Sequence, residues 1–151
     1  MRSLRRLFRR RPPAGPSDRP GSGITYAPVA DGRPDPGEVV WAWVAYEDDP
    51  SRGKDRPVLL VGRDGDRLLG LMLTSKDHDR DAAQEARWGR HWMDVGVGGW
   101  DRERRPSEVR LDRLLELTVA GVRREGAALD RAVFDRVVAA ARAQGTFAQD
   151  G

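Results

Sequence analysis

Apolar segments separated by polar stretches predict three strands in the first half of the chain. From Val39 to Tyr46 both sets of alternating positions are apolar, so this strand is expected to be buried on both faces. A polar loop ending at Lys54-Asp55-Arg56-Pro57 follows. Two strongly apolar runs, Val58 to Val61 and Leu68 to Leu73, then flank Asp64-Gly65, which is a strong hairpin-turn signal. The pattern predicts a tight antiparallel pair packed with the first strand.

The second half of the chain predicts shorter strands. A polar stretch at 76–90 is expected to be a long loop or a short helix. Strands are expected around His91 to Val95, over Ser107 to Leu111 and from Leu114 to Val119. These short strands are consistent with a small barrel.

The last element is predicted to be a helix. Leu129, Val133 and Val137 recur at helical spacing, Asp130 can cap the start, and Gly145 stands past the end. Several short strands followed by one helix predict an α+β fold, namely a small SH3-like β-barrel with a C-terminal helix.

The first 36 residues differ in composition from the rest. They begin with MRSLRRLFRRR and continue with Pro-, Gly- and Ser-rich sequence that cannot fill a core. We therefore expect a disordered basic tail at 1–36, one domain at 37–145 and a flexible C-terminus at 146–151. The tail is expected to be dispensable for folding.

The division of charge limits what the basic pI implies. Residues 1–36 contain eight Arg and three Asp, a net charge of +5, so with +3 overall the remainder carries −2. Any nucleic-acid binding by the domain must then come from a local basic rim. The absence of Cys excludes disulfides, a thiolate zinc site and a cysteine nucleophile. No apolar run approaches the roughly 20 residues that span a bilayer, so no membrane span is expected.

Four short segments occur in a recognisable order. They are GEVVW at 37–41, GKDRPVL at 53–59, Leu73-Thr74-Ser75 and SEVRL at 107–111, the last followed by Leu114. In this order they resemble the MazF/PemK family of type II toxin–antitoxin endoribonucleases. The resemblance covers about residues 37 to 143 and is specific as an ordered set, whereas each segment alone is a weak signal.

The resemblance implies a cleavage site made by Arg56 and Thr74. It implies a cytoplasmic toxin that cuts single-stranded RNA without metal or cofactor, using the ribose 2'-hydroxyl as nucleophile and leaving a cyclic phosphate. It further implies a homodimer and an antitoxin protein as partner. A guanidinium suits the charged phosphate, and a threonine hydroxyl can donate a further hydrogen bond.

Four more residues are candidates for substrate binding. Arg52 and Lys54 add positive charge in the loop before Arg56, and Ser75 is an auxiliary donor beside Thr74. His78 could serve as an acid or base, because histidine ordinarily titrates at about pH 6.5. Each of these residues has an ordinary explanation as a solvated loop or turn side chain.

The acidic residues that follow Thr74 keep other functions open. Asp77, Asp79 and Asp81 would repel RNA if they faced the groove. They favour a non-catalytic relative, either a gyrase poison like the CcdB-type toxins or a regulatory module that binds nucleic acid or protein. A general SH3-like peptide-binding domain is a third reading. The three aspartates begin like a calcium loop, but Ala82 replaces the required Gly and the closing Glu is missing, so no metal site is expected.

Overall fold

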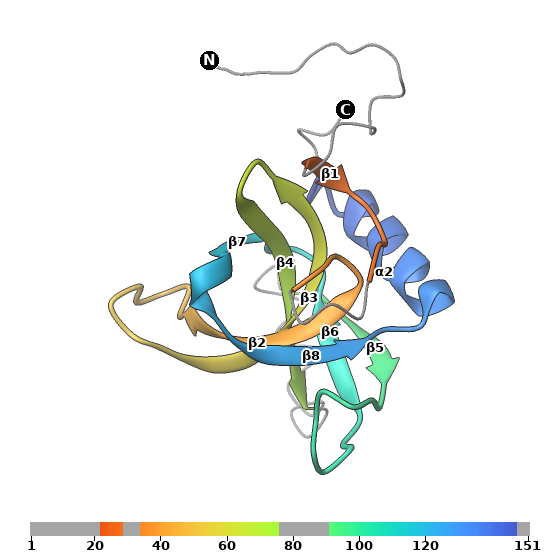
Figure 1. Cartoon of the computed structure of the whole chain (residues 1–151), viewed down its shortest axis with the longest axis horizontal. Coiled ribbons are helices and arrows are strands. Elements are labelled where there is room, and N and C mark those ends of the chain that lie inside the picture. The colour runs from red at the N-terminus through yellow and green to blue at the C-terminus, as the bar shows by residue number, and fades with distance from the viewer. Residues whose placement is uncertain (1–21, 29–33, 76–90, 148–151) are drawn as a thin grey trace.

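The computed structural model describes residues 22–28, 34–75 and 91–147 (Figure 1). In chain order the elements are β1 (Ser22–Ile24), β2 (Glu38–Ala45), β3 (Gly53–Asp64), β4 (Arg67–Ser75), β5 (Trp92–Gly96), β6 (Ser107–Arg110), β7 (Leu115–Thr118), the 3-10 turn η3 (Val119–Gly121), β8 (Val122–Ala128) and α2 (Arg131–Ala143). Neither described helix has the length and apolar character needed to cross a membrane.

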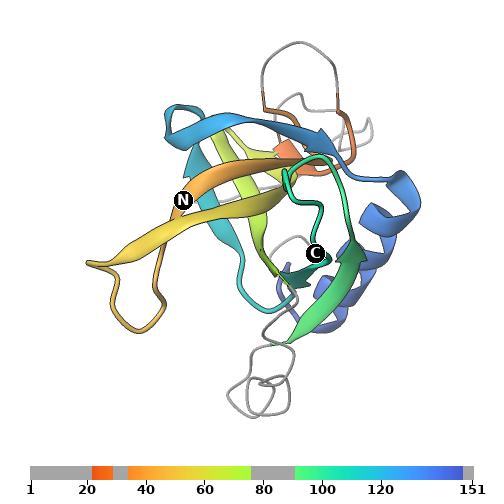
Figure 2. The ribbon, with the colours of Figure 1, turned by 90° about the horizontal axis from the view of Figure 1, so that it is seen from below.

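The eight described strands form one antiparallel sheet with one helix packed on it, which confirms the α+β class. The main path runs β5-β6-β4-β3-β2-β8, while β1 pairs with β3 and β7 pairs with β4. Figures 1 and 2 show the sheet strongly curved, with α2 along one side. As described, this is an open path from β5 to β8, and the closed ring expected of a barrel is not seen.

The central hairpin of β3 and β4 forms as the sequence predicts. Gly65 occupies the turn with a φ of 65°, a left-handed conformation that suits glycine. Strand β3 is longer than the apolar run that predicted it and includes the segment from Gly53 to Pro57 that was expected to be a loop. This extension exists because β2 pairs with it as far as Ala45↔Gly53. The polar approach to the apolar run is therefore held in the sheet.

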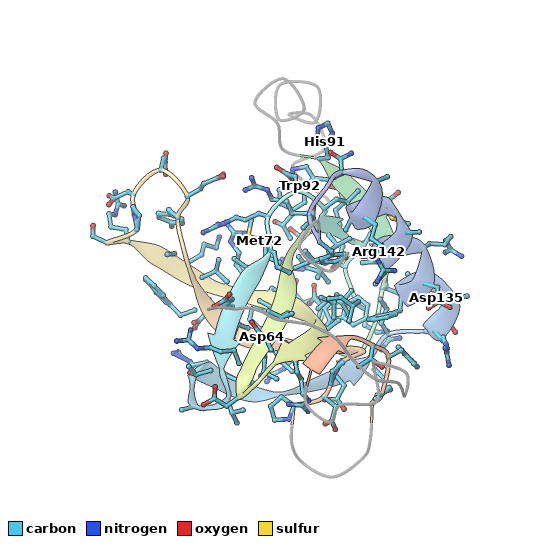
Figure 3. The ribbon with its side chains drawn as sticks, turned by 90° about the horizontal axis from the view of Figure 1, so that it is seen from above. Asp64, Met72, His91, Trp92, Asp135 and Arg142 are labelled. Carbon is cyan, nitrogen blue, oxygen red and sulfur yellow. The ribbon has the colours of Figure 1, made fainter. Side chains whose placement is uncertain are left out.

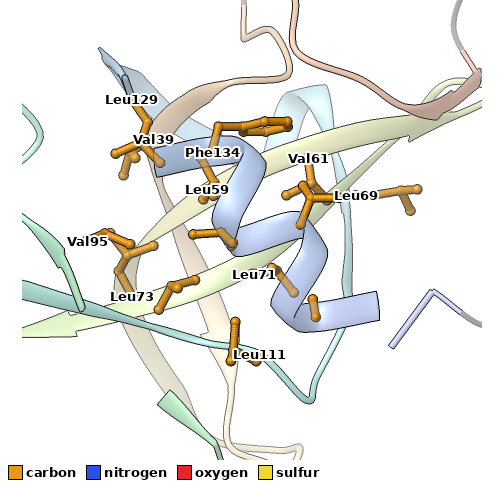
Figure 4. Packing of buried hydrophobic residues seen from close by; sticks show 14 of the residues in the cluster. Val39, Leu59, Val61, Leu69, Leu71, Leu73, Val95, Leu111, Leu129 and Phe134 are labelled. Carbon is orange, nitrogen blue, oxygen red and sulfur yellow. The ribbon is translucent and has the colours of Figure 1, made fainter. Parts of the chain in front are cut away.

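Alternation along these strands divides the buried side chains between two clusters. The first contains Leu59 and Val61, and it lies between the sheet and α2 (Figure 4). The second contains Val58 and Leu60 on the opposite face, together with Val40, Ala42, Val44, Leu68, Met72 and Leu115. The expectation that β2 is buried on both faces is confirmed for the face of Val40, Ala42 and Val44. On the other face only Val39 is fully buried and Trp43 is 48% exposed, so for that face the expectation is wrong. Complete burial of each apolar side chain contributes about 1.5–3 kcal/mol, so the apolar runs of β3 and β4, buried on both faces, contribute strongly to the stability of the fold.

Helix α2 begins and ends at the signals in the sequence. The Asp130 side chain accepts a hydrogen bond from the Ala132 amide at 3.1 Å, which satisfies one of the free donors at the helix start. Gly145 follows the C-cap with a φ of 81°. The buried face of the helix consists of Phe134, Val137, Val138 and Ala141. This face covers the first cluster.

Two parts of the expected disordered tail lie against the domain. Strand β1 pairs with the end of β3, with Ile24 opposite Gly62. The Tyr26 hydroxyl donates to the Leu129 carbonyl at 2.7 Å, and its ring lies 5.0 Å from that of Phe134. Asp35 is buried and forms an ion pair with Arg63 at 2.9 Å. For residues 22–28 and 34–36 the expectation of disorder is therefore wrong. Residues 1–21 lie outside the described part of the chain, and for them it stays a prediction.

Candidate functional site

Arg56 lies in β3, opposite Ala42 of β2 and two residues before the buried Val58. Because side chains alternate along a strand, Arg56 shares a face with Val58 and Leu60 and so lies at the margin of the second cluster. Its side chain is half-buried. The position fixes a permanent positive charge at the edge of an apolar surface.

Thr74 lies on the neighbouring strand, on the same face. The last recorded pair between β3 and β4 is Val58↔Met72, and Arg56 and Thr74 each lie two residues beyond it. From Leu73 onward, β4 pairs instead with β6, which places Thr74 opposite Glu108. The hairpin thus brings the two candidate catalytic residues to adjacent strand ends on one face.

A second arginine on this face, Arg110, is paired with two carboxylates. Its Nη2 lies 2.9 Å from Glu47 Oε1, and its Nε and Nη2 donate to the two oxygens of Asp112 at 3.0 and 3.1 Å. The Arg110 side chain is only 5% exposed. Burial alone would lower its pKa, but the hydrogen bonds that Arg110 donates to Asp112 and Glu47 outweigh burial and raise it. Arg110 therefore ties the β2–β3 loop to the turn after β6.

Arg113, in the same turn, points to the end of β2. Its Nη2 donates to the Ala45 carbonyl at 3.0 Å. Burial lowers the pKa of Arg113, and the nearby charge of Arg110 lowers it further. Burial also lowers the pKa of Arg56; Tyr46 opposes this shift and Arg113 adds to it. Among the described residues, neither Arg56 nor Arg113 forms an ion pair with a carboxylate.

Aromatic side chains border these arginines. Trp92 of β5 lies opposite Arg110 of β6 and packs against the second cluster, which includes Met72 (Figure 3). Tyr46 continues the hairpin beyond β2, and the guanidinium of Arg52 lies 5.8 Å from its ring centroid. Such rings offer flat faces on which unpaired bases can stack.

The remaining sequence-predicted residues are only partly gathered here. Lys54 is exposed on the same face of β3 as Arg56, and Ser75 is half-buried opposite Ser107. Arg52 is exposed in the β2–β3 loop, which projects from the body of the protein (Figure 2). His78 lies outside the described residues, as do Asp77, Asp79 and Asp81.

Sequence reasoning missed Arg110, Asp112, Arg113 and Glu47. The signal available was the run Arg110-Leu-Asp-Arg113, which places two arginines and a carboxylate at the end of the strand expected over Ser107 to Leu111. In chemical terms the site offers fixed guanidinium donors, one hydroxyl and aromatic faces around a curved sheet. This set is suited to a phosphate-bearing single strand. Within the described ranges, no three His, Asp or Glu side chains cluster in a way that could hold a metal ion.

Comparison with known proteins identifies the family. No curated protein matches the chain. A family model described as "PemK-like, MazF-like toxin of type II toxin-antitoxin system" matches residues 35–144, which include every described residue of the site. The match extends over most of the sheet and the whole of α2. The chain therefore belongs to the PemK-like, MazF-like toxins of type II toxin–antitoxin systems.

Proposed function

We propose that this toxin is an endoribonuclease that cleaves single-stranded RNA without a metal ion. The observation that carries the proposal is the position of Arg56, which is half-buried, without a carboxylate partner among the described residues, and on the same face as Thr74 at the adjacent strand end. Membership of the toxin family supports the assignment. Arg52, Lys54 and Ser75 would add contacts along the strand.

The proposed reaction needs few protein groups because the substrate supplies the nucleophile. The ribose 2'-oxygen forms a bond to the adjacent phosphorus, the bond to the 5'-oxygen breaks, and a cyclic phosphate remains. The 2'-hydroxyl loses its proton and the departing 5'-oxygen gains one. Arg56 would neutralise the charge that grows on the phosphoryl oxygens, and Thr74 would donate a hydrogen bond to one of them.

The test is end-mapping of a mixed-sequence, unstructured RNA incubated with purified protein in the presence of a chelator. Wild type should give fragments with cyclic phosphate ends. Removing one preorganised donor commonly costs about 10² to 10³ in rate, so Arg56→Ala should cleave that much more slowly. Thr74→Val should be milder. Arg67→Ala is the matched control, because Arg67 lies at the opposite end of β4, more than half exposed and paired with Glu116.

Two outcomes would defeat the nuclease assignment: no cleavage by wild type, or equal cleavage by wild type and Arg56→Ala. Each variant must keep the melting temperature of wild type for the comparison to count.

The proposal includes an antitoxin protein that binds the toxin, a homodimer, and action in the cytoplasm.

A non-catalytic relative is the second candidate function. Glu108 lies opposite Thr74 on β6, and Asp94 lies opposite Glu108 on β5, so two carboxylates share the face of the candidate site. Their charge opposes the approach of an RNA phosphate to Thr74. If wild type does not cleave RNA, or if Arg56→Ala cleaves it equally well, a gyrase-poison-like or regulatory binding module becomes the leading candidate function.

A further inference from the structure

The three arginines of the site differ in how their charges are balanced. Arg110 is held by two carboxylates, from Glu47 and Asp112. Arg56 and Arg113 have no carboxylate partner in the described part of the chain, although both are only partly exposed. Burial lowers the pKa of both guanidiniums; Arg113 adds to the shift of Arg56, and Arg110 adds to that of Arg113, where the charges of Glu47 and Asp112 oppose it only in part. A phosphate bound at each guanidinium would relieve that cost.

Arg113 is firmly placed for such a role. It follows Asp112, whose carboxylate accepts hydrogen bonds both from Arg110 and from the His91 amide, the latter at 2.9 Å. One guanidinium nitrogen of Arg113 donates to Ala45 at 3.0 Å. A guanidinium has five N–H donors in a fixed fork, so the contact with Ala45 leaves others for a ligand.

We propose that Arg113 binds a phosphate of the RNA strand adjacent to the phosphate held by Arg56. The proposal rests on the function proposed above and extends it to a second phosphate position. Arg56 is paired with Ala42, whereas Arg113 contacts Ala45, three residues further along β2. At roughly 3.3 Å per residue this is about 10 Å of strand. The two arginines are thus held at points about 10 Å apart along β2, and this spacing of their anchor points favours contacts with two neighbouring phosphates.

A purely structural role for Arg113 makes a different prediction. If its only task were to hold the Ala45 carbonyl, its loss would lower the melting temperature and leave the salt dependence of binding unchanged. A phosphate contact releases counterions, so its loss makes the plot of log affinity against log salt shallower by about 0.7 for a single strand.

The test measures binding of a short fluorescein-labelled 2'-deoxy oligonucleotide by fluorescence anisotropy over a range of salt concentrations. This probe cannot be cleaved through a 2'-hydroxyl, so binding is measured separately from catalysis. We expect Arg113→Gln to weaken binding at low salt about tenfold or more and to flatten the salt plot. Arg113→Lys keeps the charge and should retain most of the slope. Arg67→Gln, an exposed arginine paired with Glu116, is the matched control and should resemble wild type.

Cleavage assays then separate this inference from the function on which it rests. With an active wild type, Arg113→Gln should raise KM and leave kcat nearly unchanged, because its contact is made before and during the reaction alike. If wild type binds the deoxy strand but cuts no RNA, the nuclease proposal fails and the salt slopes alone decide on Arg113. Failure of wild type to bind the strand, or equal slopes for wild type and Arg113→Gln, would overturn the inference.

Discussion

Tyr26 gives the sharpest test of whether the segment before Gly37 belongs to the folded domain. Its hydroxyl donates to the Leu129 carbonyl at 2.7 Å, its ring packs on Phe134 at 5.0 Å with a tilt of 59°, and Arg131 lies 5.5 Å from the ring centroid. These contacts join the segment that follows β1 to the start of α2. We predict that Tyr26→Ala destabilises the protein substantially.

The magnitude follows from the separate contacts. The hydrogen bond is worth about 1 kcal/mol and the tilted aromatic pair about 1 kcal/mol. The apolar area of this half-buried ring adds about 1 kcal/mol. The sum is about 3 kcal/mol. Tyr26→Phe removes only the hydroxyl and should cost about 1 kcal/mol. For a domain of this size each kcal/mol lowers the melting temperature by about 4 °C, so the two variants should melt about 12 °C and 4 °C below wild type.

Thermal unfolding followed by circular dichroism measures both effects. Deletion of residues 1–21 is the matched control and should leave the melting temperature unchanged, whereas deletion as far as Pro34 should lower it at least as much as Tyr26→Ala. If Tyr26→Ala melts within about 1 °C of wild type, a shift that corresponds to an ordinary surface substitution, the docking of this segment on α2 is refuted.

Two further predictions concern the sheet and the charged network. A Cβ at Gly70 would lie 2.4 Å from Val58 Cγ1, so Gly70→Ala should cost about 1–3 kcal/mol by overpacking, measured by urea unfolding; unchanged stability would contradict the close packing of β3 on β4. Burial alone would raise the pKa of Asp112, but hydrogen bonds, led by that from Arg110, lower it below the unfolded value of about 3.9. The stabilisation by Asp112 is therefore complete above about pH 4 and is lost as pH falls through the folded pKa. Asp112→Asn should lower the free energy of unfolding by about 2 kcal/mol at neutral pH, measured by urea unfolding, and by less in acid. A difference between the two proteins that does not change with pH would refute the ionic contribution.

The sequence by itself determined the elements whose side chains decide their own conformation. The apolar runs of β3 and β4 are buried on both faces, as their sequences predict, and Asp64-Gly65 permits the tight turn between them. Apolar residues from Val39 to Ala45 likewise predict β2, although Trp43 remains exposed. Asp130 caps the helix through a local hydrogen bond. Alternation and hairpin pairing also placed Arg56 and Thr74 at adjacent strand ends, because both depend only on local spacing.

Tertiary structure decided the elements that depend on distant partners. Strand β8 has the polar sequence VRREGAA and is a strand because it pairs with β2, and β1 is held by the end of β3. The contacts of Arg110 with Glu47 and of Arg113 with Ala45 join segments that are far apart in sequence. No local pattern encodes such contacts, since their energy arises only after the curved sheet has brought the β2–β3 loop against the turn that follows β6. The charge balance that distinguishes Arg110 from Arg113 is therefore a property of the fold.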